Sequence, residues 1–265
     1  MKVSVIIPVY NRFTLLQKSI DSLLRQSLKP DEIIVVDDGS TLDIKEALLP
    51  YKNQIKLIQT KNLGVSSARN IGIKSAKNDW IALLDSDDEW REDKLQKQTS
   101  LHVSNPHLLF SHTGEKWIRD NKEIKYPKKL AKPQGWCFLD NTSTCKIAAS
   151  SVMFHRSICD DIGYFDEKLK VCEDYDFWLR VSYSYEIGLI DEPLIIKKAG
   201  HTQLSKEIFA IDRYHIYSLQ KFLNSKYKED VKRVIEKKCK ILIKGAIKHK
   251  NREILEEYTK IMESL

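Results

Sequence analysis

Residues 85–89 read Asp-Ser-Asp-Asp-Glu and directly follow an apolar run, so four carboxylates stand in five positions. Alternate side chains leaving a strand point to the same side, and Asp85 and Asp87 can therefore share a hard cation. Such an ion would relieve their repulsion and could bridge to a diphosphate. The same residues could instead cap a following helix at 91–104, where negative charge at the N-terminus is favourable.

Two further stretches could contact a nucleotide. In Asp37-Asp38-Gly39-Ser40, a carboxylate could accept hydrogen bonds from a base or from ribose hydroxyls. The same tetrapeptide could form only an Asx turn with Gly39 at positive φ. The stretch from Lys61 to Asn70 is expected to open a helix after a strand, and Arg69 within it could meet a phosphate or be a helix-surface charge. The chain has neither G-x-G-x-x-G nor G-x-x-x-x-G-K-[ST], which argues against the usual dinucleotide fold and a P-loop.

The second half of the chain offers candidates for acid–base chemistry. Glu173-Asp174 opens an expected helix, and adjacent carboxylates there suit a general base or simply cap the helix. Trp178 could offer its face to a sugar ring or lie in the core. His201 could ligate a metal, contact a phosphate or be structural.

The spacing of apolar residues predicts strands alternating with helices over the first hundred residues. We expect buried strands at 3–9, 33–36, 55–59 and 80–84, with helices at 13–27, 43–50, 64–77 and 91–104. This alternation is typical of a parallel sheet with helices on both faces. Tyr10-Asn11, Asp37-Asp38 and Asp85-Ser86-Asp87 each follow a strand, so we expect them at the carboxyl edge, where such sheets bind ligands.

The pattern is looser beyond residue 105. We expect irregular segments and short strands at 105–150, a strand at 150–154, a helix from 173 to 183, and short strands at 187–197 split by Pro193. From 207 onward the spacing predicts amphipathic helices.

Charge and cysteine content limit the possible partners. The 265 residues carry a net charge of +7. Residues 1–205 hold 29 basic and 28 acidic side chains, and residues 206–265 hold 15 and 9. The acidic motifs of the body have the wrong sign for nucleic acid. The basic C-terminal part could lie on an anionic membrane or be a solvated lysine face. Five cysteines without C-x-x-C spacing, no signal peptide and no apolar run of membrane length lead us to expect a cytoplasmic protein.

Five stretches occur in an order and spacing that resemble glycosyltransferase family 2. They are IIPVYNR (6–12), VVDDGST (35–41), KNLGVSSARNIGI (61–73), WIALLDSDDEW (80–90) and CEDYDFWLRV (172–181). The resemblance covers residues 1–205 and implies the GT-A fold. It divides the chain into a nucleotide-binding half (1–104), an acceptor and catalytic half (105–205) and a basic helical extension (206–265).

The family resemblance also implies transfer of a sugar from a nucleotide diphosphate, a UDP-sugar by family habit, to a glycan or lipid-linked acceptor with inversion. By position it implies these roles: Pro8, Val9, Tyr10 and Asn11 shape the base pocket; Asp37 and Asp38 contact the base; Arg69, Asp85 and Ser86 contact ribose or phosphates; Asp87 and His201 hold Mg²⁺ or Mn²⁺; Asp174, with Glu173 beside it, is the base. Breaking the sugar–diphosphate bond leaves negative charge that such an ion neutralises.

Two other classes remain open, a Mg²⁺-dependent phosphatase-like enzyme and a non-catalytic nucleotide-sugar-binding module. The absence of Q-x-x-R-W after Asp174 and of membrane spans favours a single addition over polymer synthesis in cell-surface polysaccharide assembly.

Overall fold

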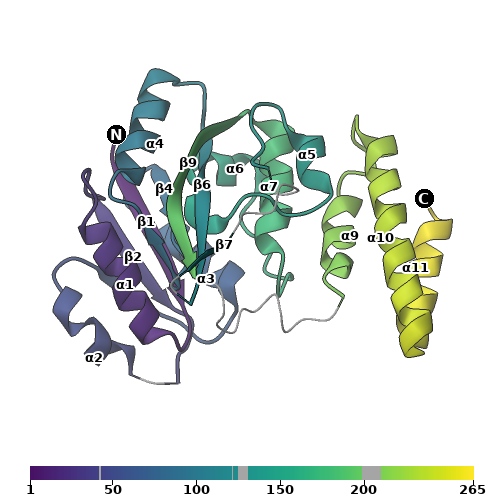
Figure 1. Ribbon diagram of the computed structural model, residues 1–265, viewed down its shortest axis with the longest axis horizontal. Helices are drawn as coiled ribbons and strands as arrows, with labels where there is room; N and C mark the ends of the chain where they lie inside the picture. The colour runs from purple at the N-terminus through teal and green to yellow at the C-terminus, as the bar shows by residue number, and fades with distance from the viewer. Residues whose placement is uncertain (42, 121, 125–130, 199–209) are drawn as a thin grey trace.

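The computed structural model describes residues 1–41, 43–120, 122–124, 131–198 and 210–265 (Figure 1). Strands and helices alternate through the first part of the chain. In order these are β1 (Val3–Val9), α1 (Phe13–Leu24), β2 (Glu32–Asp37), α2 (Ile44–Leu48), β3 (Lys56–Gln59), α3 (Val65–Ser75), β4 (Trp80–Leu83), β5 (Asp88–Trp90) and α4 (Lys94–Ser104). The four apolar strands and four helices expected here are confirmed, with boundaries that differ by a few residues.

The second part contains a longer strand than expected. Its elements are β6 (Phe110–Arg119), β7 (Lys122–Ile124), α5 (Phe138–Thr142), a 3₁₀ turn η3 (Ala149–Ser151), β8 (Met153–His155), α6 (Ser157–Ile162), α7 (Glu173–Ser184) and β9 (Ile187–Lys198). The expectation that 105–150 holds only irregular segments and short strands is wrong, because β6 has ten residues. Strand β9 runs through Pro193, and the irregularity appears as a shift in its pairing with β6 near Gly114.

Within the described residues, nine strands form one sheet in the order β3-β2-β1-β4-β8-β6-β9-β5, with β7 paired to β6. Strands β3, β2, β1 and β4 are parallel to one another. The β6–β9 pair is also parallel, whereas β8 and β5 join antiparallel. The sheet is thus mixed, with a parallel half that matches the continuous apolar strands of the sequence.

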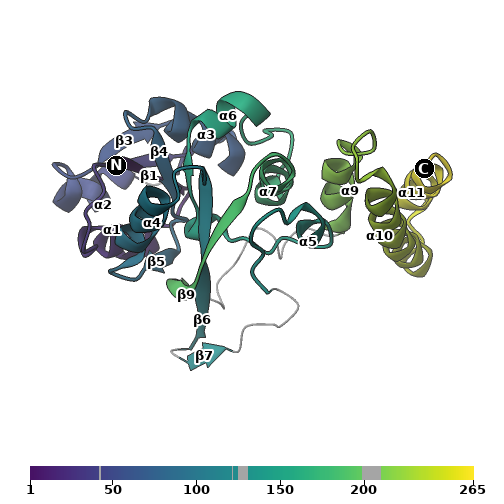
Figure 2. The ribbon, with the colours of Figure 1, turned by 90° about the horizontal axis from the view of Figure 1, so that it is seen from above.

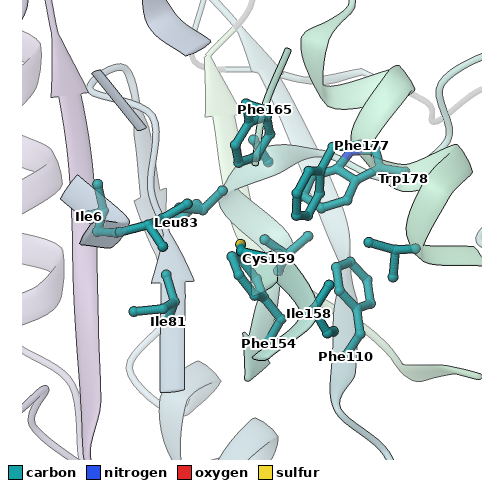
Figure 3. Close-up of a cluster of buried hydrophobic side chains, with 14 of the residues drawn as sticks. Ile6, Ile81, Leu83, Phe110, Phe154, Ile158, Cys159, Phe165, Phe177 and Trp178 are labelled. Atoms are coloured by element: carbon teal, nitrogen blue, oxygen red, sulfur yellow. The ribbon is translucent and has the colours of Figure 1, made fainter. Parts of the chain in front are cut away.

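Alternate residues of β1 enter two separate cores, as the period of a strand requires. Val5 and Ile7 pack with α1, α2 and α4 on one face. Ile6 packs with α3, α6 and α7 on the other, in the cluster shown in Figure 3. Gly72 of α3 lies so close to this face that a Cβ atom would stand 2.4 Å from Ile6 Cγ2.

Three helices, α9 (Asp212–Gln220), α10 (Lys228–His249) and α11 (Arg252–Glu263), follow the sheet. They lie at the end of the molecule away from the parallel strands (Figures 1 and 2). A third apolar core joins them to α5 and α7 through Phe138, Tyr175 and Leu179. None of the described helices is long and apolar enough to cross a membrane.

Candidate active site

The carboxyl ends of β1, β2 and β4 meet at one edge of the sheet. The parallel register places Val9 beside Asp37 and Ile6 beside Leu83. The segments beginning at Tyr10, Asp38 and Leu84 therefore leave the sheet side by side, as the sequence predicts.

The loops after β1 and β2 are tied together by Asn11. Its side-chain Oδ1 accepts a hydrogen bond from the Thr41 N–H at 2.9 Å, and its own N–H donates to Ser40 Oγ at 2.9 Å. Asn11 has a φ of 52°, a left-handed conformation that asparagine tolerates better than most residues. Of the four residues expected at a base pocket, Pro8 and Val9 are buried in β1, while Tyr10 and Asn11 are exposed.

Asp38 is buried and organises the loop that leads into α3. Its two carboxylate oxygens accept hydrogen bonds from the N–H groups of Leu63, at 2.9 Å, and Gly64, at 2.8 Å. Gly39 has a φ of 74°, and a Cβ atom there would lie 2.6 Å from the nitrogen of Asn62. Asp37 is also buried and accepts from the Ser40 N–H at 3.1 Å. The Asp-Asp-Gly-Ser turn thus shapes this edge of the sheet.

Arg69 connects the two halves of the site and is not a helix-surface charge. Its guanidinium lies 2.8 Å from Asp85 Oδ1 and 2.5 Å from Glu173 Oε1, and the residue is only 3% exposed. Asp85 follows β4, whereas Glu173 begins α7, 104 positions after Arg69. The two ion pairs therefore bring the first turn of α7 to the carboxyl edge of the sheet, where the sequence predicts that a nucleotide binds.

The shared guanidinium affects the two carboxylates differently. Burial would raise the pKa of Asp85, but Arg69 and Lys197 lower it below its ordinary value. Burial raises the pKa of Glu173 to about 7, against the lowering by Arg69 and with a further rise from Asp174. Asp85 is therefore held ionised, while Glu173 can take up a proton near neutrality.

Each remaining carboxylate of the Asp-Ser-Asp-Asp-Glu segment faces a basic side chain. Asp87 Oδ2 lies 2.5 Å from Arg12, which follows β1. Asp88 accepts from Lys197 at 2.6 Å, and Glu89 is paired with Lys198. These cations offset the repulsion that the sequence alone suggests.

Asp88 and Glu89 do not cap α4, contrary to one reading of the sequence. They form β5, which pairs with β9, and Asp93 stands at the N-terminus of α4. Ser150 Oγ donates a hydrogen bond to Asp88 Oδ2 at 2.6 Å. The same Ser150 Oγ accepts a hydrogen bond from the Asp85 N–H at 3.0 Å. Ser86, between them in sequence, is buried.

The metal expectation rests on Asp85 and Asp87. Among the described residues, no three His, Cys, Asp or Glu side chains are grouped to hold an ion. His201 lies outside the described residues. An ionised Asp85 and the neighbouring Asp87 nevertheless supply the oxygen donors that Mg²⁺ and Mn²⁺ prefer. Mg²⁺ bound by one or two carboxylates takes its other ligands from water and phosphate, so the residues present fit such an ion.

Asp174 is the more accessible of the two acids that open α7. It is half-buried, whereas Glu173 is buried against Arg69. The Tyr175 N–H donates to Asp174 Oδ1 at 2.7 Å, and the Cys145 thiol lies 3.5 Å from its Oδ2. Cys172, the residue just before α7, has a φ of 60°, so the chain turns sharply into the helix.

Trp178 belongs to the core and offers no face to a sugar. It is 1% exposed, and its ring centroid lies 5.3 Å from that of Phe110 and 6.0 Å from that of Phe165 (Figure 3). The residues that sequence reasoning missed are Arg12, Lys197 and Ser150. They stand 75, 109 and 62 positions from their acidic partners, and only the basic or hydroxyl residue type hints at a role.

Comparisons with known proteins identify the family to which this chain belongs. The family model for "Glycosyl transferase family 2" matches residues 4–163. The chain is 31% identical to the Bacillus subtilis protein YwdF over 191 residues, which cover 71% of this chain and 70% of YwdF. The protein is therefore a member of glycosyltransferase family 2, as the five sequence stretches predict.

Two further relatives differ in how much of their own length the chain covers. An uncharacterized glycosyltransferase of Rickettsia conorii is 38% identical over 197 residues, 73% of this chain, and the chain spans about a third (32%) of it. The Escherichia coli UDP-Glc:alpha-D-GlcNAc-diphosphoundecaprenol beta-1,3-glucosyltransferase WfgD is 30% identical over 206 residues, 77% of this chain and 78% of WfgD.

The fold is shared with a solved structure. The structure of residues 1–349 of S. aureus TarS in complex with UDP-GlcNAc aligns with a TM-score of 0.67 and 21% identity, over 88% of this chain and 70% of that one. This likeness confirms the expected GT-A fold.

Proposed function

We propose that the protein is an inverting glycosyltransferase that moves one sugar from a nucleotide diphosphate to an acceptor hydroxyl in a single displacement. The observation that carries the proposal is the Arg69 clamp, which holds Asp85 and Glu173 and thereby sets Asp174 beside the carboxyl edge of β4. A donor on that edge would have its reactive end near a half-buried carboxylate, and inversion requires one base and no covalent nucleophile.

The donor we propose is a UDP-sugar. WfgD is named for the use of UDP-glucose, and the TarS structure contains UDP-GlcNAc. The loops bearing Tyr10, Asn11 and Asp38 would hold the base, and those bearing Arg69, Asp85 and Ser86 the ribose and phosphates. WfgD is also named for a diphosphoundecaprenol acceptor. We therefore propose a glycan or lipid-linked acceptor in cell-surface polysaccharide assembly. The five unpaired cysteines agree with work in the reducing cytoplasm.

Asp87, with Asp85 beside it, would hold Mg²⁺ or Mn²⁺. That ion would supply Lewis-acid stabilisation of the diphosphate as the sugar leaves. Arg12 and Arg69 contact different carboxylates of this proposed metal site. Arg12 stands against Asp87, and Arg69 keeps Asp85 ionised, so the carboxylates are oriented before any ligand binds.

Asp174 is the base we propose for the acceptor hydroxyl. Its accessibility favours it over Glu173, which is buried and paired with Arg69. Glu173 would act instead by orienting Arg69 and the start of α7. Substitution of Asp174 should therefore lower the rate of transfer about 100-fold to 10,000-fold, which is what a general base contributes.

The test is Asp174→Asn, with Asp191→Asn at an exposed position of β9 as the matched control. Asp174→Asn should bind UDP-sugars by calorimetry as the wild type does and lose transfer at least 100-fold, while the control keeps both. Transfer by Asp174→Asn at near the wild-type rate would refute the assignment. Release of inorganic phosphate in place of UDP by the wild type would favour the phosphatase-like class. Donor binding without any turnover would favour a non-catalytic module.

A further inference from the structure

Helix α10 presents a continuous basic face to solvent. Arg233, Lys237, Lys240, Lys244 and Lys248 are exposed and recur every three or four positions, so they line one side of the helix. With Ile241 and Ile247, which lie on the same side, they form what we call the basic stripe. From Arg233 to Lys248 the exposed residues of this side include no carboxylate, and the acidic residues Glu229 and Asp230 stand in the first turn of the helix.

The opposite side of α10 fixes the direction in which the stripe faces. Val231, Ile235, Cys239, Leu242 and Ala246 are buried in the third core. The helix cannot rotate without exposing them. In Figures 1 and 2 α10 lies beyond α9, at the end of the molecule opposite the parallel strands.

The stripe combines unneutralised charge with projecting apolar side chains. Within the described part of the chain, no carboxylate oxygen lies within 4.0 Å of the Nζ atom of Lys237, Lys240, Lys244 or Lys248, so none of these lysines forms an ion pair there. Arg233 alone has a partner, Asp230 at 3.3 Å. Ile241 and Ile247 are 60% and 63% exposed, although isoleucine is among the residues most often buried.

We propose that the basic stripe is a docking surface for a membrane rich in anionic phospholipid. Lysines around two exposed isoleucines are what an interfacial helix needs, since the cations meet lipid headgroups and the apolar side chains enter the acyl boundary. Nucleic acid would use the cations and leave the isoleucines in water. The inference rests on the proposed function for its purpose, which is to bring the enzyme to a lipid-linked acceptor.

The buried side of α10 connects this surface to the candidate active site. Lys238 Nζ lies 2.9 Å from the Ser143 carbonyl oxygen and 2.9 Å from His215 Nδ1. The His215 ring stands 4.2 Å from that of Tyr175, the residue after Asp174. Docking through the stripe would therefore hold the first turn of α7 in a fixed relation to the lipid surface.

The experiment is sedimentation of the full chain with vesicles of phosphatidylcholine alone or with 30% phosphatidylglycerol, a composition of about one anionic lipid in three. The stripe variant carries Lys237→Glu, Lys240→Glu, Lys244→Glu and Lys248→Glu. The matched control carries Lys18→Glu, Lys45→Glu, Lys52→Glu and Lys77→Glu at exposed positions of the sheet domain. Both variants change the net charge equally.

We expect the wild type to bind anionic vesicles, and to bind them less as salt is added. The stripe variant should bind at least 100-fold less, since each lysine near such a surface contributes about fivefold. The control should remain within a few fold of the wild type, and Ile241→Ser with Ile247→Ser should weaken binding about tenfold or more. Absence of wild-type binding, or equal loss in the control, would overturn the proposal. Tighter binding to duplex RNA than to vesicles, insensitive to the isoleucine changes, would also overturn it.

An assay of sugar transfer to a soluble acceptor, in which the release of UDP is measured, separates this inference from the proposed function. The stripe variant should transfer at the wild-type rate there. A chain that binds anionic vesicles through the stripe but releases no UDP would leave the docking surface standing and defeat the proposed transfer.

Discussion

Arg69 offers one guanidinium to two carboxylates, half-buried Asp85 and buried Glu173, that belong to distant parts of the chain. The competition is unequal because Lys197 and Arg12 also lower the pKa of Asp85, whereas Asp174 raises that of Glu173. Asp85 thus keeps its charge. Among Arg69, Asp85 and Glu173, it is Glu173 that titrates near neutral pH.

This assignment predicts how stability depends on pH. Burial raises the pKa of Glu173 from 4.5 to about 7, so the folded state binds more protons than the unfolded state between these values. Stability from this group is fully present below pH 4.5 and falls as pH rises toward 7. Compared with Glu173→Gln, the wild type should lose roughly 2–3 kcal/mol of unfolding free energy over this range.

Urea denaturation at pH 5, 6, 7 and 8 would measure the difference between the two proteins. Glu253→Gln, at an exposed position of α11, should show no such trend. A wild type that gained stability over Glu173→Gln as pH rose would show that the Arg69 ion pair outweighs burial.

At the scale of elements, β5 is the feature that departs most from the expected pattern. It is a three-residue strand, Asp88-Glu89-Trp90, with the carboxylate of Asp88 buried. Burial raises the pKa of Asp88 to about 6, and Lys197 of β9 opposes this rise. The pairing of β5 with β9 therefore includes a buried ion pair as well as backbone hydrogen bonds.

Removal of Lys197 should consequently destabilise the protein in a pH-dependent manner. Lys197→Met leaves Asp88 buried without its cation and should cost about 3 kcal/mol at pH 8. The cost should be smaller at pH 5, where Asp88 takes up a proton. Lys198→Met removes the neighbouring, more exposed pair with Glu89 and should cost less than about 1 kcal/mol.

Denaturation of both variants at the two pH values is the measurement, and Asp88→Asn in the Lys197→Met background should recover most of the loss. Equal costs for Lys197→Met and Lys198→Met at pH 8 would contradict a buried pair.

The elements that the sequence predicted well are those whose burial follows a simple period. Strands β1, β2 and β4 are nearly unbroken apolar runs, and α1 repeats Leu and Ile at helical spacing. In contrast, β5 is acidic and β6 mixes basic and aromatic residues, so neither shows a strand period. Their extended conformation depends on β9, which joins the sheet about a hundred residues after β5.

The candidate site divides in the same way. Asp38, Asp85 and Glu173 could be found because they stand at strand or helix ends and within recognisable stretches. Their ion-pair partners could not, because nothing local distinguishes Arg12 or Lys197 from a surface cation. The buried Asp38 carboxylate also illustrates a limit, since its hydrogen bonds to Leu63 and Gly64 depend on the path of a separate loop.

At the scale of the whole molecule, the C-terminal helices are part of the folded body. The third core buries Tyr175 and Leu179 of α7 against residues of α9 and α10, including Ile216 and Val231. The described part, 210–265, of the extension predicted for 206–265 is therefore packed against the helix that begins with Glu173 and Asp174. Point substitutions on its exposed face are a better probe of docking than truncation, which would expose this core.

The β5–β9 pair also limits how this enzyme can be recombined with its relatives. Asp88 stands opposite Lys197, and Trp90 stands opposite Ile195, so residues 1–104 are incomplete as a transferable cassette. A chimera joined at residue 104 should show weak donor binding, whereas a graft that also carries 187–198 should retain the parental donor preference in a UDP-sugar binding assay. Equal UDP-sugar binding by the two chimeras would contradict the requirement for residues 187–198. If β9 is required in this way, an exchange of residues 1–104 between relatives has to include a strand that lies in the second half of the sequence.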